Sequence, residues 1–153
     1  MKVSQNQVNR RDFIKKAAIG AGGLLTFPFF IRPSALGKWK STSPSNRIVM
    51  GVIGCGAMGS GNAQTFLNHF SNVQIVAVCD VDRERAESLK RQIDSKYGNL
   101  DCAIYEDFRE MIGRGDLDAI THAVPDHWHA LIAVSCARAG LDMYGEKPLA
   151  RTI

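Results

Sequence analysis

Three glycines and an aspartate are the residues of this chain whose types and spacing could do chemistry. Gly54, Gly56 and Gly59 form a GxGxxG pattern directly after the expected strand 47–53, and Asp80 follows Gly59 by 21 positions. In such a pattern the first glycine permits a tight turn, the second lets the backbone approach a diphosphate, and the third lets a helix pack closely on a strand. The spacing therefore predicts a dinucleotide site, with a glycine turn carrying an incidental aspartate as the alternative.

The helix that begins after this turn would present unpaired N–H groups and a partial positive charge to the phosphates. We therefore expect Ala57 and Met58 to join the glycines in binding the cofactor, with Asp80 on the adenosine ribose. A carboxylate there favours NAD, because it repels the 2′-phosphate of NADP. Arg83 is close enough in sequence to reverse that preference, so NADP remains the alternative.

A GxGxxG pattern is weak evidence alone, so the elements around it decide its meaning. Strands are expected at 47–53, 73–80, 102–105, 118–124 and 141–146, and helices at 57–70, 82–97, 106–113 and 126–139. Alternating strands and helices predict an α/β fold, a Rossmann-type doubly wound parallel sheet with right-handed crossovers. Ligands bind such sheets at the carboxyl ends of the strands, which is where the glycine turn and Asp80 fall.

Two of the expected helices carry more detailed predictions. Helix 57–70 is expected to bury one apolar face, made of Met58, Ala63, Phe66, Leu67 and Phe70. Helix 82–97 is expected to begin at an Asp82 cap and to end at Gly98. Its inward face is expected to be Ala86, Leu89, Ile93 and Tyr97.

The four cysteines, at 55, 79, 102 and 136, never form a CxxC pair, so neither a zinc site nor a disulfide framework is indicated. We expect them to be small buried hydrophobic residues, with Cys55 the most accessible. His127 and His129 are two positions apart on a helix and cannot share a face, so no metal site is expected.

Two further stretches follow expected strands: VPDHWHA at 124–130 and GEKPLA at 145–150. Together with GVIGCGAMG and VCDVD they resemble the N-terminal domain of the Gfo/Idh/MocA family, which includes glucose-fructose oxidoreductase and inositol dehydrogenase. The resemblance spans residues 47–153. It implies that Lys147 is the catalytic residue, beside the nicotinamide ribose, where its ammonium orients the reacting carbinol of a sugar or cyclitol and eases its deprotonation.

The same resemblance implies that Glu146 fixes the nicotinamide end of the cofactor, and that Pro125, Asp126 and His129 pack along the nicotinamide ribose. Three positions depart from the family pattern. They are Val124, where threonine is common, His122, in a strand usually made of aliphatic residues, and Gly145, where cysteine is frequent.

The resemblance implies an NAD-dependent oxidoreductase that acts on a secondary alcohol of a sugar or cyclitol. The chain stops at KPLARTI, so we expect a fragment that lacks the C-terminal α/β substrate domain and is inactive alone. One alternative is a glycoside hydrolase that retains NAD, although such relatives resemble a WEWH loop where this chain reads DHWH. The other is a non-catalytic nucleotide-binding protein of the cell envelope. Assembly into a homo-oligomer is left open by the sequence.

Residues 1–37 are expected to be an export signal. Arg10 and Arg11, followed by an uncharged stretch of fifteen residues, resemble a twin-arginine signal, with the twin-arginine translocase as partner and a periplasmic or secreted protein as product. A stable membrane span would need about 20 apolar residues. An uncleaved amphipathic N-terminus is the alternative. Residues 38–46 are expected to be a polar linker, and 47–153 the NAD(P)-binding domain.

The net charge of +4 belongs to this leader, which holds six Lys and Arg against one Asp. From Lys38 onward there are 13 basic and 14 acidic residues. A nucleic-acid partner is therefore not expected, because the remainder lacks the basic surface that such binding requires.

Overall fold

The computed structural model describes residues 44–151. The predicted export signal, with Arg10 and Arg11, and nearly all of the predicted linker lie outside the described residues. Within 44–151, no helix is long and apolar enough to cross a membrane.

The described chain alternates strands and helices in the order that the sequence predicts. After a short 3-10 turn (η2, Pro44–Asn46) the elements are β1 (Ile48–Ile53), α2 (Ala57–His69), β2 (Val73–Cys79), α3 (Arg83–Tyr97), β3 (Ala103–Tyr105), α4 (Phe108–Ile112), β4 (Ala119–His122), α5 (Asp126–Arg138) and β5 (Asp142–Gly145). Each predicted strand and helix is present, with ends that differ by one or two residues.

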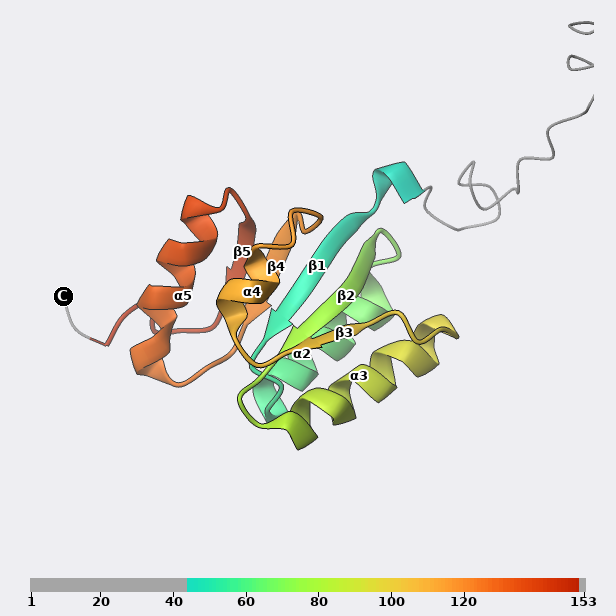
Figure 1. The fold of residues 1–153 in the computed structure, drawn as a ribbon, viewed down its shortest axis with the longest axis horizontal. Helices are drawn as coiled ribbons and strands as arrows, with labels where there is room; N and C mark the ends of the chain where they lie inside the picture. Colours follow the sequence, from blue (N-terminus) through green and yellow to red (C-terminus); the bar gives the residue numbers. More distant parts are fainter. Residues whose placement is uncertain (1–43, 152–153) are drawn as a thin grey trace, which may run out of the picture. The chain divides into compact units, whose positions relative to one another are not determined.

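The five strands form one parallel sheet in the order β3-β2-β1-β4-β5, with β3 and β5 at its edges (Figure 1). From β1 the chain first builds the sheet toward β3 and then returns to the other side of β1 to add β4 and β5. The connections leaving β1 and β4 therefore diverge, which opens a crevice at the carboxyl ends of these strands. This topology confirms the predicted Rossmann-type doubly wound sheet.

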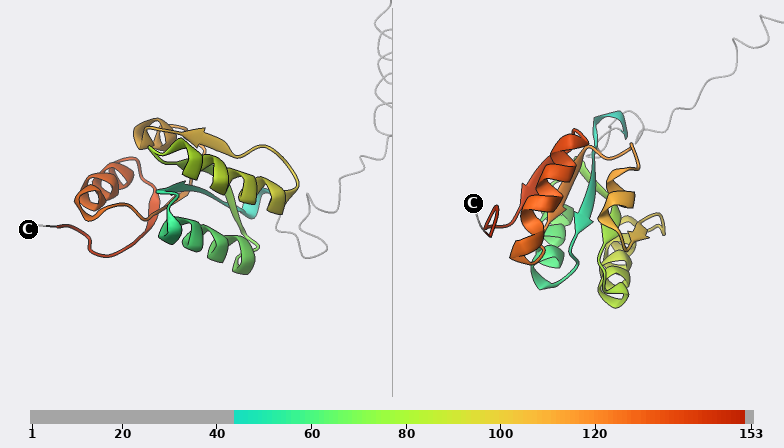
Figure 2. Two further views of the ribbon diagram at one scale, coloured as in Figure 1. Left: turned by 90° about the horizontal axis from the view of Figure 1, so that it is seen from below. Right: turned by 60° about the vertical axis from the view of Figure 1, so that its left-hand side comes forward.

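Helices cover both faces of the sheet (Figure 2). The buried side chains of α2 and α3 form one core with β1 and β2, which includes Ala63, Leu67 and Leu89. Those of α4 and α5 form a second core on the opposite face, which includes Met111 and Ile132. Both faces of the sheet are therefore buried, and the loops at its carboxyl edge extend from packed strands.

Helix α3 follows its local signals closely. The Asp82 side chain accepts hydrogen bonds from the backbone N–H groups of Glu84 and Arg85, and Gly98 ends the helix in the left-handed conformation at φ 68°. Ala86, Leu89 and Ile93 are fully buried. Tyr97 is half-buried, and its hydroxyl accepts a hydrogen bond from the Ile75 N–H at 3.0 Å. The predicted cap, stop and inward face of this helix are confirmed.

The predicted inner face of α2 is only partly correct. Ala63 and Leu67 are buried and Phe66 is partly buried, but Met58 is 60% exposed and Phe70 is 46% exposed. Met58 lies in the first turn of α2, at the carboxyl edge of the sheet, and Phe70 follows the last helical residue. Both residues therefore lie at the ends of the helix and outside the core.

Candidate functional site

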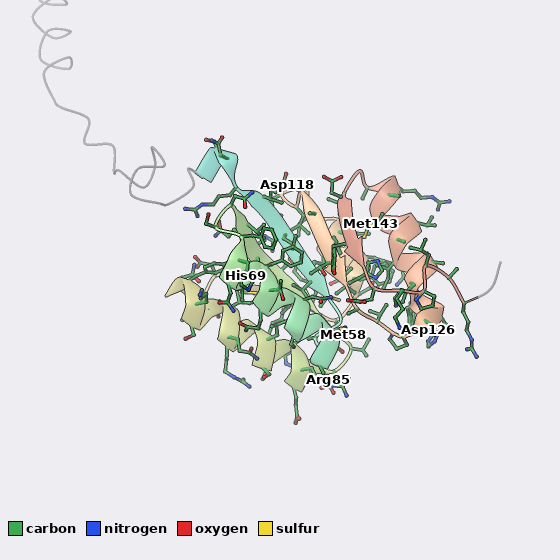
Figure 3. All side chains as sticks on the ribbon, turned by 180° about the vertical axis from the view of Figure 1, so that it is seen from behind. Met58, His69, Arg85, Asp118, Asp126 and Met143 are labelled. Carbon is green, nitrogen blue, oxygen red and sulfur yellow. The ribbon has the colours of Figure 1, made fainter. Side chains whose placement is uncertain are left out.

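A cleft of about 260 Å³ lies at the carboxyl edge of the sheet, and its wall includes the ends of β1 and β2 and the segment after β4. Figure 3 shows Met58, Arg85 and Asp126, each in the first turn of its helix, at this edge of the molecule. Asp118, which precedes β4, lies at the opposite edge. The N-termini of three helices therefore gather around the cleft, and each contributes a partial positive charge.

The glycine turn forms one wall of the cleft. Gly54 has φ +86°, and a Cβ there would run into the carbonyl oxygen of Ala123. A Cβ on Gly59 would run into the carbonyl oxygen of Gly54, so α2 packs directly on the turn. Both geometries match the tight turn and the close packing that the pattern predicts. Gly56 differs, because the nearest atom to a Cβ there would be Arg85 Nη1, at 3.9 Å.

The start of α2 can accept a phosphate. Gly56 is its N-cap residue and lines the cleft, and no side chain caps the helix. The first N–H groups of a helix have no partner within the helix, so those of Ala57 and Met58 can donate to a bound anion. The open space at Gly56 lets an anion approach them. The residues present thus fit the diphosphate of a dinucleotide.

Asp80 lies beside this turn. Its Oδ2 accepts a hydrogen bond from the Cys55 N–H at 2.7 Å, and its Oδ1 accepts one from the Asp82 N–H at 2.9 Å. These bonds hold the carboxylate at the cleft wall. Each carboxylate oxygen has a second lone pair, so Asp80 can also accept hydrogen bonds from the hydroxyls of a ribose.

Two arginines follow Asp80, and the structure separates their positions. Arg83 contacts Glu87 at 3.0 Å and Glu106 at 3.5 Å, and it does not line the cleft. Arg85 does line the cleft, and its Nε lies 3.1 Å from Asp82 Oδ2. Arg85 is therefore the cation closest to the glycine turn. The sequence pointed to Arg83 for that role, and Arg85 was not predicted.

The opposite wall of the cleft includes Val124, Pro125 and Trp128. Asp126 is exposed in the first turn of α5, and Pro125 is the N-cap residue. His129 lies behind this wall, only 2% exposed, with its Nε2 2.7 Å from the carbonyl oxygen of Val124. The structure thus brings Pro125 to the cleft but keeps the His129 side chain out of the cleft wall, behind Val124.

Glu146 and Lys147 follow β5 and are not in the cleft wall. The Glu146 N–H donates to the carbonyl oxygen of His122 at 3.1 Å, and its Oε1 accepts from Asn62 Nδ2 at 3.0 Å. Lys147 is exposed. Asn62, on α2, was not predicted as a site residue, because no local signal pairs it with a residue 84 positions away.

The four cysteines are free and buried. The prediction that Cys55 is accessible is wrong, because the residue is 4% exposed and its Sγ lies 3.6 Å from the carbonyl oxygen of Cys79. Burial and the nearby Asp80 carboxylate raise the pKa of Cys55 to about 12. Within residues 44–151, no three His, Cys, Asp or Glu side chains are grouped so that they could hold a metal ion.

Known proteins share this architecture. The model of the oxidoreductase family with an NAD-binding Rossmann fold (GFO_IDH_MocA) matches residues 48–153. A glycosyl hydrolase family 109 protein of Shewanella pealeana is 29% identical over an alignment 161 positions long, which covers 96% of this chain and 35% of that protein. Inositol 2-dehydrogenase 1 of Saccharopolyspora erythraea is 34% identical over 103 residues, covering 67% of this chain and 29% of that protein.

Among solved structures, myo-inositol dehydrogenase of Lactobacillus casei in complex with NAD(H) and myo-inositol aligns with a TM-score of 0.62 and 29% identity. The alignment covers 68% of this chain and 29% of that one. The chain thus spans about a third of the length of the relatives it matches. The match over residues 48–153 and the five-stranded parallel sheet agree with each other, and the chain belongs to the Gfo/Idh/MocA oxidoreductase family, of which it carries the NAD-binding Rossmann domain.

Proposed function

We propose that this chain is the cofactor-binding part of an NAD-dependent oxidoreductase that acts, with a C-terminal domain, on a secondary alcohol of a sugar or cyclitol. The observation that carries the proposal is the Asp80 carboxylate, fixed by the Cys55 N–H beside an uncapped helix start and the open space at Gly56. A diphosphate on the turn and a ribose on the carboxylate would use all three features together.

The cofactor is NAD rather than NADP in this proposal. A 2′-phosphate on the adenosine ribose would stand against Asp80, and Glu106 adds a second carboxylate to the same cleft. Arg83, which could offset this repulsion, is already paired with Glu87 and Glu106. Arg85 remains as the cation of the cleft; its Nε pairs with Asp82, and its Nη1 lies 3.9 Å from where a Cβ on Gly56 would stand.

When bound, NAD supplies the hydride acceptor for oxidation of the alcohol. The residues of this chain then have separate tasks in the proposal. Lys147 donates a hydrogen bond to the reacting hydroxyl, which orients it and favours loss of its proton. Glu146, tied to Asn62, holds the nicotinamide end. Pro125 and Asp126, at the start of α5, lie along the nicotinamide ribose, and His129 supports them through the Val124 carbonyl.

Calorimetric titration of the chain with NAD and NADP tests the cofactor assignment. We expect NAD to bind at least about tenfold more tightly, which corresponds to about 1.4 kcal/mol. Asp80→Asn should narrow this preference, because the amide no longer repels a phosphate. Asp142→Asn, an exposed carboxylate at the start of β5, is the matched control and should leave it unchanged. If the chain binds neither NAD nor NADP, the proposal is refuted.

The reaction is tested with the full-length gene product. NADH formation from NAD should accompany oxidation of one member of a panel of cyclitols and sugars, and Lys147→Met should abolish it with a much smaller effect on NAD binding. A Lys147→Met variant that keeps its turnover would show that the proton is handled elsewhere.

A second candidate is a glycoside hydrolase that retains NAD and returns the hydride at the end of each turnover. One observation favours it: the glycosyl hydrolase family 109 protein aligns with 96% of this chain, whereas the inositol dehydrogenase aligns with 67%. Incubation of the full-length gene product with an aryl glycoside separates the two. Release of the aryl alcohol without net NADH identifies the hydrolase, and net NADH formation from a free sugar or cyclitol identifies the dehydrogenase.

Export by the twin-arginine translocase to the periplasm belongs to the same proposal. It is supported by the Arg10–Arg11 pair and by the alignment with a family 109 relative over nearly the whole chain. Replacing both arginines by lysine should retain the protein in the cytoplasm, as measured by cell fractionation.

A further inference from the structure

His122 and Gly145 face each other at the carboxyl ends of β4 and β5, where the two strands are paired in register. A Cβ on Gly145 would stand 2.7 Å from His122 Cε1 and closer still to His122 Nε2. The imidazole of His122 therefore occupies the space that a side chain at Gly145 would take. Any residue other than glycine at 145 would have to displace the ring.

The ring has little room to move. His122 is 4% exposed, and its ring also meets the His129 ring edge-to-face, with ring centroids 5.3 Å apart. His129 is held in turn by its contact with the Val124 carbonyl oxygen at 2.7 Å. One stack of three groups thus runs from Val124, in the cleft wall, through the two imidazoles to Gly145 at the end of β5.

The stack ends where the proposed nicotinamide residues begin. The Glu146 N–H donates to the His122 carbonyl oxygen at 3.1 Å, so the backbone that leads into Glu146 and Lys147 is bonded to the same residue whose ring lies over Gly145. The adenosine end of the cleft is built differently, from the glycine turn and Asp80. The backbone of His122 pairs with Ile53, just before that turn, whereas its ring lies against Gly145 on the β5 side.

The buried polar atoms of the stack show that it is more than apolar filling. Nδ1 of His122 and Nδ1 of His129 have no hydrogen-bond partner in the described structure, although an apolar residue at either position would bury no such atom. Burial and His129 lower the pKa of His122, while Glu146 acts in the opposite direction, so the ring is neutral at physiological pH. A neutral ring can lie against His129 without the repulsion of two charges.

We propose that His122 is a positioning residue for the nicotinamide half of the cofactor: its ring, seated between His129 and Gly145, sets the position of the β5 exit that carries Glu146 and Lys147. The inference rests on the proposed NAD site. It adds a residue to that site that neither touches the cofactor nor lines the cleft.

The test compares binding of NAD and ADP by calorimetry, since ADP carries only the adenosine and diphosphate half. His122→Ala removes the ring and should weaken NAD binding about tenfold, while the affinity for ADP stays within about twofold of the wild type. Thr121→Val is the control. Thr121 is the neighbouring buried residue, its side chain lies on the other face of the sheet, and its Oγ1 has no partner in the described structure.

Gly145→Ala disturbs the same contact from the other side, on the exposed edge strand β5. Unlike His122→Ala, it leaves no cavity that could impair folding. It should also weaken NAD binding about tenfold and spare ADP. In the His122→Ala background the added methyl has room, so Gly145→Ala should then change NAD affinity less than about twofold.

The remaining outcomes each decide a different point. Equal loss of NAD and ADP affinity would mean a general structural defect, and no loss of either would mean that the ring positions nothing; both overturn the inference. If the wild type binds NAD no more tightly than ADP, the positioning role is wrong while the proposed cofactor site stands. If the wild type binds neither ligand, the proposed function fails, and the inference fails with it.

Discussion

Gly56 and Gly59 lie three residues apart in the same turn, and the structure predicts opposite consequences for adding a methyl group to each. At Gly56 the new Cβ would have no neighbour closer than Arg85 Nη1 at 3.9 Å, and the backbone, at φ −67° and ψ −172°, is extended and open to alanine. At Gly59 the Cβ would collide with the carbonyl oxygen of Gly54. Gly56→Ala should therefore affect binding, and Gly59→Ala should affect folding.

The magnitudes follow from these contacts. Gly56→Ala loses a favourable N-cap residue, which costs about 0.5 kcal/mol of unfolding free energy. Gly59→Ala overpacks a rigid contact, which costs about 1–3 kcal/mol. At about 4 °C per kcal/mol for a domain of this size, the melting temperature should fall by about 2 °C and about 4–12 °C, respectively. The methyl at Gly56 instead occupies the space for the diphosphate, so NAD and ADP should both bind at least about tenfold more weakly.

Thermal unfolding and calorimetric titration measure the two effects separately. Gly61→Ala is the matched control, because Gly61 lies on the exposed side of α2 with nothing within 4 Å of an added Cβ. It should stabilise the helix by about 0.5–1 kcal/mol and leave binding unchanged. If Gly56→Ala binds NAD as tightly as the wild type, the diphosphate does not lie on this turn, and the site built from Gly54, Gly56 and Asp80 is wrong.

Three further predictions concern stability and reactivity. The four cysteine thiols, whose pKa values burial raises to about 11 or 12, should resist iodoacetamide at pH 8 in the folded chain and react after unfolding in urea. Lys90→Met should cost about 3 kcal/mol in urea unfolding, because it strands the buried carboxylate of Asp94, 2.7 Å from Lys90 Nζ; Lys96→Met, at an exposed position, should cost less than about 0.5 kcal/mol. The lowered pKa of His122 means that the unfolded chain takes up this proton first, so stability should decline as pH falls below about 6.5, and His122→Phe should flatten that decline.

Local signals such as cap and stop residues predicted the elements of this fold well. Each signal lies within one helical turn of the helix end that it sets. Asp82 accepts from residues two and three positions ahead of it, and Gly98 takes the one backbone conformation that favours glycine. The burial of Met58 and Phe70 was mispredicted for a related reason. Helical periodicity shows which side of α2 faces the sheet, but it does not show where the sheet ends beneath the helix.

The site was harder to predict wherever two distant segments meet. The choice between Arg83 and Arg85 depends on Glu106, a residue 23 positions after Arg83 that pairs with it across the edge of the cleft. The contact of His122 with Gly145 depends on the register between β4 and β5. Sequence spacing contains neither fact, because a helix phase and a strand register are fixed only when the whole sheet has packed.

Because β1 lies in the centre of the sheet, the parts of the cleft on its two sides are held by different hydrogen bonds. On one side, the β1 turn is bonded to the end of β2 through the Cys55 N–H and Asp80. On the other, the end of β4 is bonded to the exit of β5 through His122 and Glu146. A dinucleotide that lies across the carboxyl end of β1 would place its adenosine half on the first pair and its nicotinamide half on the second. A substitution on the β5 side should then weaken NAD binding more than ADP binding, whereas one on the glycine-turn side should weaken both.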